Sequence, residues 1–416
     1  MECYNNYVKI KSNAFVGTEA EFVLKTVFGY KKFRQNQKEI ITNLLNKKDT
    51  LAIMPTGGGK SLCYQIPALI FEGMTIVVTP LISLMQNQVA SLEKGGIHSV
   101  FLNSSLDWES YKKAVREIKA GLVKIVYLSP EGLASEKVRG ILNDSTLNVS
   151  CIAVDEAHCI SEWGHDFRPD YLEIAFIRRI FPEAVMIALT ATATKTVQKD
   201  IIKDLALKKP TVFSSSFNRP NIYLQVQTKT NELTQIIDFL KKHKGQSGII
   251  YCNSRLQVDR LAESLHKKRF SVLNYHAGLS DECRARNQEL FLKGRVQIIV
   301  ATIAFGMGID KSDVRFVINC DLPKSIEEYY QEIGRAGRDG KTSEALLLFS
   351  YKDVQKNRFF IEDSYNPKGA AEHLNAMVDY AKSRSCRREK LLSYFGEAWE
   401  GGNDEENCCC DICSQS

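Results

Sequence analysis

The sequence lacks the features of membrane, secreted and disordered proteins. No apolar run reaches the roughly 18 residues that a membrane-spanning helix needs. Polar residues interrupt the stretch from Met1 to Ile10, so it has no apolar core of a secretion signal. Proline is scarce, with 10 residues in 416, and no low-complexity tract occurs. We therefore expect an intracellular globular protein without a membrane segment.

What the sequence does contain is ordinary globular composition, with 44% hydrophobic and 25% charged residues. The net charge of +6 is compatible with a polyanionic partner but is too small to identify one. The 12 cysteines are more informative, because without a secretion signal they are expected to be reduced thiols. They are unevenly spread, since residues 386–416 hold Cys386, Cys408, Cys409, Cys410 and Cys413.

Short β-branched runs alternate with segments of helical period, which is typical of parallel strands joined by helices. The first set of expected strands is Leu51–Met54, Ile76–Thr79, Ile125–Leu128, Ile152–Val154 and Val185–Leu189. The second set is Ile249–Cys252, Val272–Tyr275, Ile298–Ala301, Phe316–Asn319 and Leu346–Phe349. The pattern predicts an α/β protein with two tandem parallel-sheet domains and a small helical C-terminal module.

Leu207–Asn221 separates the two sets and is interpreted as a linker, because it holds two prolines and three consecutive serines. We place the first domain at residues 1–208 and the second at 209–343. Residues 344–416, which are helical, basic and then cysteine-rich, form the third part.

Met54–Ser61 reads Met-Pro-Thr-Gly-Gly-Gly-Lys-Ser between an expected strand and an expected helix. Glycines let backbone N–H groups turn toward phosphate oxygens, and the following helix adds its positive end. The segment therefore predicts a phosphate-binding loop, although Met54 replaces the usual first glycine. The alternative is a glycine-rich turn without a ligand. The residues expected at ATP are Thr56, Gly57, Gly58, Gly59, Lys60 and Ser61, with Lys60 at the β- and γ-phosphates and Ser61 on Mg²⁺.

Asp155 and Glu156 directly follow the expected strand Ile152–Val154. A carboxylate at this position can hold Mg²⁺, and an adjacent one can deprotonate the attacking water. We assign Asp155 to the metal and Glu156 to the water. A solvated acidic turn is the alternative, and the phosphate-binding loop upstream argues against it.

Gln331–Arg338 reads Gln-Glu-Ile-Gly-Arg-Ala-Gly-Arg, and we expect Arg335 and Arg338 on one face of a helix. Arginines there can stabilise the charge that develops on a transferred γ-phosphate. Gln331, Arg335 and Arg338 are therefore candidate catalytic residues. The alternative is a surface helix with exposed arginines.

These segments, in this order, resemble the superfamily 2 helicases, and Phe28–Gln37 narrows the resemblance to the RecQ family of ATP-dependent DNA helicases. The resemblance implies that Tyr30 stacks on adenine, Gln37 bonds to its edge and Arg34 supports the pocket. A glutamine amide both donates and accepts, which matches adenine.

Ile160–Tyr171 resembles the aromatic-rich loop that couples single-strand binding to hydrolysis in this family. We expect Trp163, Phe167 and Tyr171 to stack on bases and Arg168 to contact phosphate. Core packing is the alternative for each aromatic residue taken singly.

Thr79–Gln88 resembles a DNA-contacting motif of the family, which places Thr79 and Ser83 at the nucleic acid. The resemblance covers residues from about Phe28 to Cys413. It implies two RecA-like motor domains, ATP-dependent 3′→5′ movement on DNA and unwinding of forked or tailed duplexes, with roles in recombination and repair. It also implies ATP, Mg²⁺ and Zn²⁺ as cofactors, and a location in the cytoplasm and nucleoid of a bacterium or the nucleus of a eukaryote.

Cys386 precedes a helical stretch, and Cys408–Cys413 supplies a tight cluster, which together predict a tetrahedral zinc site. It resembles the zinc-binding module of the family. Cys386, Cys410 and Cys413 match its motif, whereas Cys408 or Cys409 must supply the fourth ligand. Cys408 is preferred, because adjacent Cys409 and Cys410 are hard to bend onto one ion.

A basic helix end precedes this cluster, where either a solvated face or a contact with duplex phosphate is expected. Its residues are Lys382, Arg384, Arg387, Arg388 and Lys390.

Two other functions stay open: an RNA-dependent ATPase of the same superfamily, and a binding or strand-annealing module without catalysis. The chain ends three residues after Cys413, whereas RecQ proteins commonly continue into a winged-helix domain that splits the duplex. ATP hydrolysis and translocation are therefore better supported than efficient unwinding.

Overall fold

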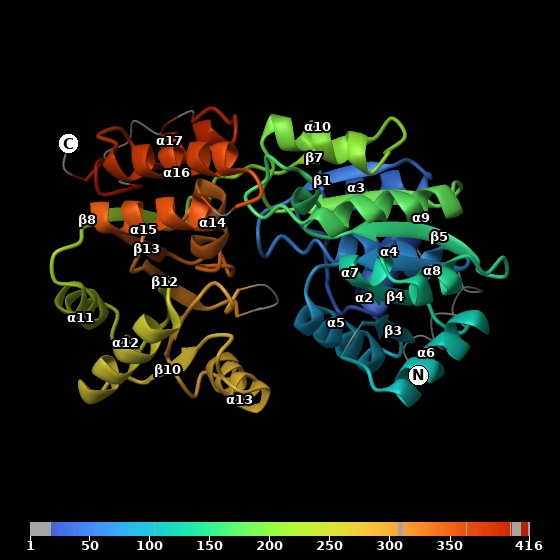
Figure 1. The fold of residues 1–416 in the computed structure, drawn as a ribbon, viewed down its shortest axis with the longest axis horizontal. Helices are drawn as coiled ribbons and strands as arrows, with labels where there is room; N and C mark the ends of the chain where they lie inside the picture. The colour runs from blue at the N-terminus through green and yellow to red at the C-terminus, as the bar shows by residue number, and fades with distance from the viewer. Residues whose placement is uncertain are drawn as a thin grey trace. The chain divides into compact units, whose positions relative to one another are not determined.

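The computed structural model describes residues 18–103, 105–306, 311–362, 364–399, 401 and 409–414, and the chain divides into two compact units, Met1–Ser216 and Phe217–Ser416. Each unit is built on one sheet with flanking helices (Figure 1). In the part of the chain that is described, no helix is long and apolar enough to cross a membrane. The predicted α/β class with two parallel sheets is confirmed.

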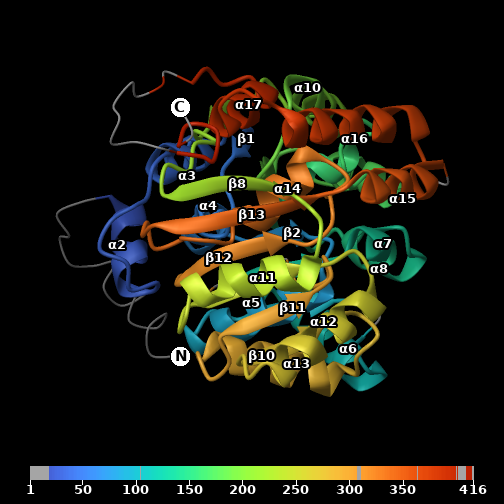
Figure 2. The same ribbon diagram turned by 90° about the vertical axis from the view of Figure 1, so that its left-hand side faces the viewer.

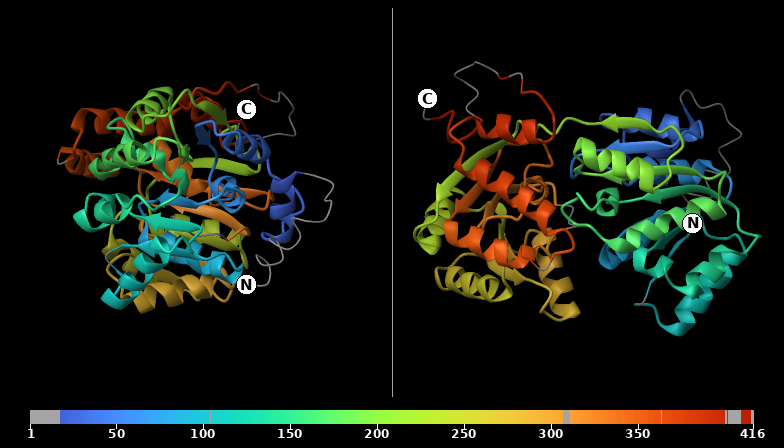
Figure 3. Two further views of the ribbon diagram at one scale, coloured as in Figure 1. Left: turned by 90° about the vertical axis from the view of Figure 1, so that its right-hand side faces the viewer. Right: turned by 45° about the horizontal axis from the view of Figure 1, so that its top comes forward.

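The first unit has a seven-stranded sheet in the order β3-β4-β2-β5-β6-β1-β7, and all its pairings are parallel. Figure 3 (left) faces this unit. Its strands are β1 (Thr50–Ile53), β2 (Met74–Val78), β3 (Ser99–Leu102), β4 (Ile125–Leu128), β5 (Val149–Val154), β6 (Val185–Thr190) and β7 (Thr211–Ser214). Its helices are α2 (Glu19–Thr26), α3 (Gln37–Leu45), α4 (Leu62–Ile70), α5 (Ile82–Lys94), α6 (Trp108–Lys119), α7 (Pro130–Leu133), α8 (Glu136–Leu142), η1 (Ala157–Ile160), η2 (Pro169–Glu173), α9 (Ile174–Ile180) and α10 (Lys195–Asp204).

The second unit has a six-stranded parallel sheet in the order β10-β11-β9-β12-β13-β8. Figure 2 shows α11 and α12 crossing the near face of this sheet. Its strands are β8 (Ile222–Thr228), β9 (Ser247–Tyr251), β10 (Val272–Tyr275), β11 (Ile298–Ala301), β12 (Val314–Asn319) and β13 (Ser343–Phe349). Its helices are α11 (Glu232–Lys242), α12 (Arg255–Lys267), α13 (Asp281–Leu292), α14 (Ile326–Ile333), α15 (Tyr351–Glu362), α16 (Pro367–Lys382) and α17 (Arg387–Tyr394).

The ten strands predicted from apolar runs are all present, and β3, β7 and β8 are additional. The interpretation of Leu207–Asn221 as a linker is wrong in part, because β7 lies within it and pairs with β1. The first sheet therefore extends past the expected boundary at residue 208. The expected boundary at 343 falls at the first residue of β13, which pairs with β12 and β8.

Local sequence explains where the helix before the phosphate-binding loop forms. Ile40, Ile41 and Leu44 repeat at helical spacing in α3, and all three are fully buried. They join the core of the first unit, which also contains the inward side chains of β1, β2 and β6. This packing places the start of α3, and so Gln37, beside the turn that follows β1.

The C-terminal helices form a layer of their own on the second unit. α15 packs against α16, and α17 contacts both α16 and β8. These helices, coloured red, lie together in Figure 3 (right). An isolated parallel bridge between Leu224 and Cys410 then joins the end of the chain to the edge strand β8. The cysteine-rich segment is therefore anchored to the second sheet.

Candidate functional site

The phosphate-binding loop joins β1 to α4 at the carboxyl edge of the first sheet, as predicted. Gly57 and Gly59 adopt left-handed backbone angles, with φ of 79° and 80°. A side chain at Gly59 would strain this left-handed backbone and would place its Cβ 2.4 Å from Nε2 of Gln37, so glycine is strongly favoured here. Nζ of Lys60 donates to the carbonyl of Met54 at 3.4 Å, which curls the lysine over the loop. The loop is shaped to present backbone N–H groups to an anion.

Gln37 is buried, and its side-chain amide forms hydrogen bonds with the phosphate-binding loop. Nε2 donates to the carbonyls of Gly58 and Gly59 at 3.4 and 3.1 Å, while Oε1 accepts from the backbone N–H of Arg34 at 2.8 Å. The Arg34 guanidinium donates to the carbonyl of Gly57. Sequence reasoning expected these two residues at adenine and missed their contact with the loop.

Tyr30, the third residue expected at adenine, has a side chain that is 51% exposed. An exposed aromatic ring is available for stacking on a base. Its stacking role stays a prediction.

Asp155 follows β5 and lies on the same edge of the sheet as the loop. In the sheet order, β6 alone separates β5 from β1, so the ends of β5 and β1 lie close together. Burial raises the pKa of Asp155 to about 7, the adjacent Glu156 adds to the rise, and Lys60 opposes it. A desolvated carboxyl of this kind gains from a bound cation, which favours its ionised form. The donor set therefore fits the Mg²⁺ expected there.

Glu156 has a left-handed backbone, with φ of 47°, which turns its side chain toward His158. Oε2 of Glu156 lies 3.4 Å from Nδ1 of His158 and, among the described residues, accepts no hydrogen bond. Nδ1 of His158 also lies 2.8 Å from Oγ1 of Thr190, at the end of β6. His158 thus links the acidic pair to the segment after β6, a connection that sequence reasoning missed.

The aromatic-rich loop has exposed and buried members. The side chain of Trp163 is 43% exposed, and Phe167 is half-buried. Arg168 pairs with Asp166 at 3.1 Å. The expectation that Tyr171 stacks on bases is wrong, because its ring is fully buried and its hydroxyl donates to the carbonyl of Asp155 at 2.9 Å. Tyr171 instead supports the acidic pair from the core.

Thr79 lies at the end of β2 and is buried, with a side-chain hydroxyl that has no hydrogen-bond partner in the described structure. Ser83 lies in α5, but its side chain is outside the described residues. Their contact with nucleic acid stays a prediction.

The expectation that Arg335 and Arg338 share a helical face is wrong. The helix α14 contains Gln331 but ends at Ile333, with Gly334 as its C-cap. Gly337 has a φ of 58°, and a Cβ there would lie 2.3 Å from Nδ2 of Asn221. Gly337 is therefore required by a turn, and Arg335 and Arg338 lie in that turn.

Arg335 is buried, and its guanidinium donates to the carbonyl of Gly306 within the same unit. Arg338 is half-buried. The turn is held by Arg219, which sequence reasoning left without a role. Arg219 donates to the carbonyls of Gly334, Ala336 and Gly337 at 3.0, 2.8 and 3.1 Å.

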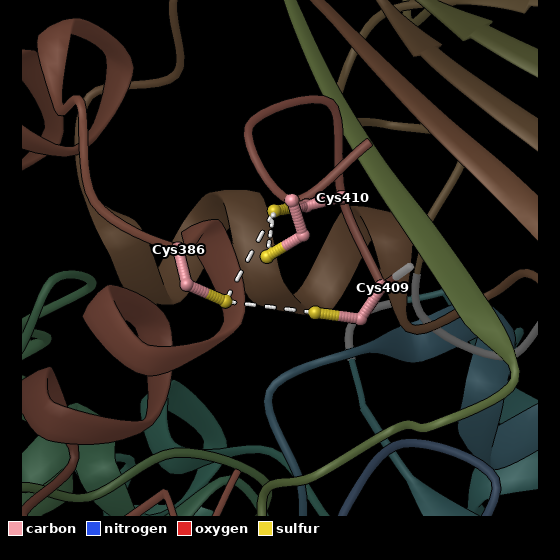
Figure 4. Close-up of side chains that lie close together, drawn as sticks. Cys386, Cys409 and Cys410 are labelled. Atoms are coloured by element: carbon pink, nitrogen blue, oxygen red, sulfur yellow. Dashed lines mark hydrogen bonds between the residues drawn. The ribbon is translucent and has the colours of Figure 1, made fainter. Parts of the chain in front are cut away.

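Four thiols converge where α17 begins. Sγ of Cys386 lies 3.5 Å from that of Cys409 and 4.0 Å from that of Cys410, which is 3.4 Å from Sγ of Cys413. Figure 4 shows Cys386, Cys409 and Cys410 pointing toward one another. Sulfurs around one zinc ion at about 2.3 Å are separated by about 3.8 Å, so the group fits tetrahedral Zn²⁺.

The fourth ligand differs from the preferred one. Cys408 lies outside the described residues, and Cys409 completes the described group of four. The argument that adjacent Cys409 and Cys410 cannot converge is wrong, because both thiols lie within 4.8 Å of the other two. The backbone N–H of Arg387 also donates to Sγ of Cys410 at 3.4 Å, as is common around metal-bound sulfur.

The basic helix end divides into two groups. Arg387 and Arg388 are buried: Arg387 pairs with Asp411 at 2.9 Å, and Arg388 donates to the carbonyls of Arg219 and Ile222, each at 2.7 Å. Both expectations for these two arginines, a solvated face and a phosphate contact, are therefore wrong. The exposed members are Lys382, Arg384 and Lys390.

Comparison with known proteins finds family models that match three successive parts of the chain. Residues 34–200 match the DEAD/DEAH box helicase model, residues 228–340 the helicase conserved C-terminal domain, and residues 351–414 the RecQ zinc-binding model. A DEAD-box helicase solved with single-stranded RNA has a similar fold, with a TM-score of 0.68 at 20% identity over 86% of this chain and 78% of that one.

Sequence relatives are closer. The chain is 47% identical to the ATP-dependent DNA helicase RecQ of Haemophilus influenzae over 94% of its own length and 63% of that protein. It is 43% identical to a putative ATP-dependent RNA helicase of Acanthamoeba polyphaga mimivirus, over 93% of this chain and 71% of that one. The chain thus spans less than two thirds of the bacterial relative.

Proposed function

Because the chain belongs to the RecQ family of helicases, we propose that it hydrolyses ATP and uses the energy to move along single-stranded DNA. The observation that supports this most directly is the carboxyl edge of the first sheet, where Lys60, Asp155 and Glu156 gather. A phosphate-binding loop and two acidic residues at one sheet edge are the parts that ATP hydrolysis requires.

In the proposed reaction, loop N–H groups and Lys60 hold the phosphates, and Ser61 and Asp155 hold Mg²⁺, which neutralises phosphate charge. Glu156 accepts a proton from the attacking water, while His158 fixes the orientation of its carboxylate. Gln37 and Tyr30 hold adenine, and the amide of Gln37 connects that pocket to the loop.

Arg335 and Arg338 are proposed to stabilise the charge that develops on the γ-phosphate, with Gln331 beside them. In the described structure the Arg335 guanidinium also donates to the carbonyl of Gly306.

We further propose 3′→5′ movement and unwinding of forked or tailed DNA in recombination and repair, inside the cell. Trp163, Phe167, Arg168, Thr79 and Ser83 would contact the strand. Support comes from the family and from the exposed ring of Trp163. Buried thiols such as Cys63 and Cys151, which form no disulfide, fit a reducing compartment.

The test is an ATPase assay with single-stranded DNA and, separately, with single-stranded RNA of the same length. We expect DNA to stimulate hydrolysis and Lys60→Ala to abolish it. Stimulation by RNA alone would favour an RNA-dependent enzyme, the activity in the name of the mimivirus relative. A wild-type rate equal to that of Lys60→Ala would leave only a binding or annealing module. Unwinding is measured in parallel on forked and 3′-tailed duplexes.

A further inference from the structure

A second group of potential metal ligands lies beside the acidic pair, in the first unit. Nε2 of His158 lies 3.7 Å from Sγ of Cys159, which lies 3.7 Å from Oδ2 of Asp166. One ligand atom of each residue lies within 4.8 Å of the other two. His158 and Cys159 are buried, whereas Asp166 is partly exposed and leaves a route for an ion from solvent.

The two ring nitrogens of His158 face different groups. Nδ1 lies 2.8 Å from Oγ1 of Thr190, whereas Nε2 lies 3.7 Å from Sγ of Cys159. In metal sites a histidine commonly binds the ion through one ring nitrogen while a neighbouring polar group holds the other. The contact of Nδ1 with Thr190 therefore fits coordination through Nε2.

We propose that His158, Cys159 and Asp166 form a second metal site, which binds a borderline-soft divalent ion of the Zn²⁺ type and slows ATP hydrolysis when occupied. A nitrogen, a sulfur and an oxygen donor suit Zn²⁺, whereas Mg²⁺ selects oxygen. Three protein ligands leave the fourth position to water, as in exchangeable zinc sites. Formation of the Zn–S bond releases the proton of the Cys159 thiol to solvent, and no electron is transferred.

The consequence for hydrolysis follows from what His158 touches. Nδ1 of His158 lies 3.4 Å from Oε2 of Glu156, so an ion on Nε2 fixes the ring that contacts the carboxylate of the proposed base. The same ion joins His158 to Asp166, which pairs with Arg168 in the aromatic-rich loop. It thereby restrains the loop against the acidic pair. The inhibition rests on the proposed function, whereas the binding of the ion does not.

Binding is tested on the full chain after its C-terminal zinc has been loaded. Equilibrium dialysis against buffered Zn²⁺, followed by metal analysis, is expected to find two ions per chain in the wild type and one in Cys159→Ser. Loss of a residue that only hydrogen-bonds to a metal ligand lowers metal affinity by about 10–100-fold. Loss of the Cys159 ligand itself is therefore expected to lower Zn²⁺ affinity at least as much. The matched control is Cys151→Ser, a fully buried thiol on β5 that should keep both ions.

The proposal is overturned if the wild type binds one ion only, or if Cys159→Ser still binds two. Asp166→Asn, on the partly exposed loop, provides a second variant in case Cys159→Ser does not fold, and it should also weaken the second ion. Far-ultraviolet circular dichroism checks folding.

Inhibition is tested with the same proteins. Zn²⁺ in the range that fills the second site should slow DNA-stimulated hydrolysis by wild type and Cys151→Ser, and leave Cys159→Ser unaffected. If the second ion binds without slowing hydrolysis, the regulatory half of the proposal is wrong. If no variant hydrolyses ATP with or without zinc, the proposed function fails, while the dialysis result still decides the site.

Discussion

Acidic residues lie at the carboxyl edges of both sheets, but the charged groups around them differ. In the second sheet, Lys229 follows β8 and lies 2.9 Å from both Asp321 and Asp353. Burial disfavours the charged form of Lys229, yet the two carboxylates outweigh it and raise its pKa. In the first sheet the nearby Lys60 does not offset the burial of Asp155, whose pKa rises to about 7.

The difference separates structural from functional charge. Asp321 and Asp353 at the second edge have their cation, Lys229, within the fold. The first edge keeps a desolvated carboxyl and a carboxylate oxygen without a hydrogen bond, which an external cation and a water molecule would satisfy. The four thiols of the second unit are an exception to this division, because they too are arranged to bind an ion from solution.

The largest effect is expected at the four thiols of the zinc site. Cys409→Ser should lose the C-terminal zinc and unfold the segment around α17, because binding of a structural zinc contributes about 10–16 kcal/mol. Cys408→Ser is the matched control and should retain the ion. Zinc analysis and hydrogen exchange measure the two outcomes. Loss of zinc from Cys408→Ser alone would return the assignment to Cys408.

At the first edge, Glu156→Gln should lower the DNA-stimulated ATPase rate by about 100- to 10,000-fold, because the amide cannot accept the proton of the attacking water. ATP binding should persist, since the loop and Lys60 are untouched. Glu232→Gln, at the edge of the second sheet and 3.6 Å from Lys229, serves as the control and should leave the rate nearly unchanged. A similar loss of rate in both variants would contradict the contrast between the edges.

At the second edge, Lys229→Met should reduce stability instead of activity. Removing the cation leaves the charges of Asp321 and Asp353 buried without a counterion, which costs about 3–5 kcal/mol of unfolding free energy. Lys241→Met breaks an exposed pair with Asp238 and should cost less than about 1 kcal/mol. Denaturant unfolding of the two variants gives the comparison. Equal stabilities would mean that the Lys229 group contributes nothing to the fold.

Most of the fold could be predicted because central parallel strands are continuously apolar. The strands that were missed are less distinctive. β7 and β8 are edge strands, β7 has alternating burial, and β3 is half-buried in its middle, so none forms a fully apolar run. The serines and prolines around β7 made a short strand resemble a linker.

The site was predictable where backbone shape and chemistry are encoded together, as in the glycines before Lys60. Charged residues were harder, because an arginine can bind phosphate, solvent or a carbonyl with the same sequence signature. Arg387, Arg388 and Arg335 turned out to bind groups within the fold. Only partners distant in sequence, such as Asp411 and Ile222, distinguish these cases. The convergence of Cys409 with Cys410 likewise depends on the bridge from Cys410 to Leu224.

The smallest effect is expected at Gln37, whose amide holds the phosphate-binding loop in shape for ATP. Gln37→Leu removes the hydrogen bonds of its amide to Gly58 and Gly59 and leaves two partly buried carbonyls without that donor. Each such loss costs about 1–3 kcal/mol, which should raise the KM for ATP by about tenfold or more. If the amide also reads adenine, the rise will be smaller for GTP, which the wild type should use poorly. An equal rise in KM for both nucleotides would mean that Gln37 only supports the loop and does not contact adenine. Gln37 would then be a structural residue, like Lys229 at the second edge.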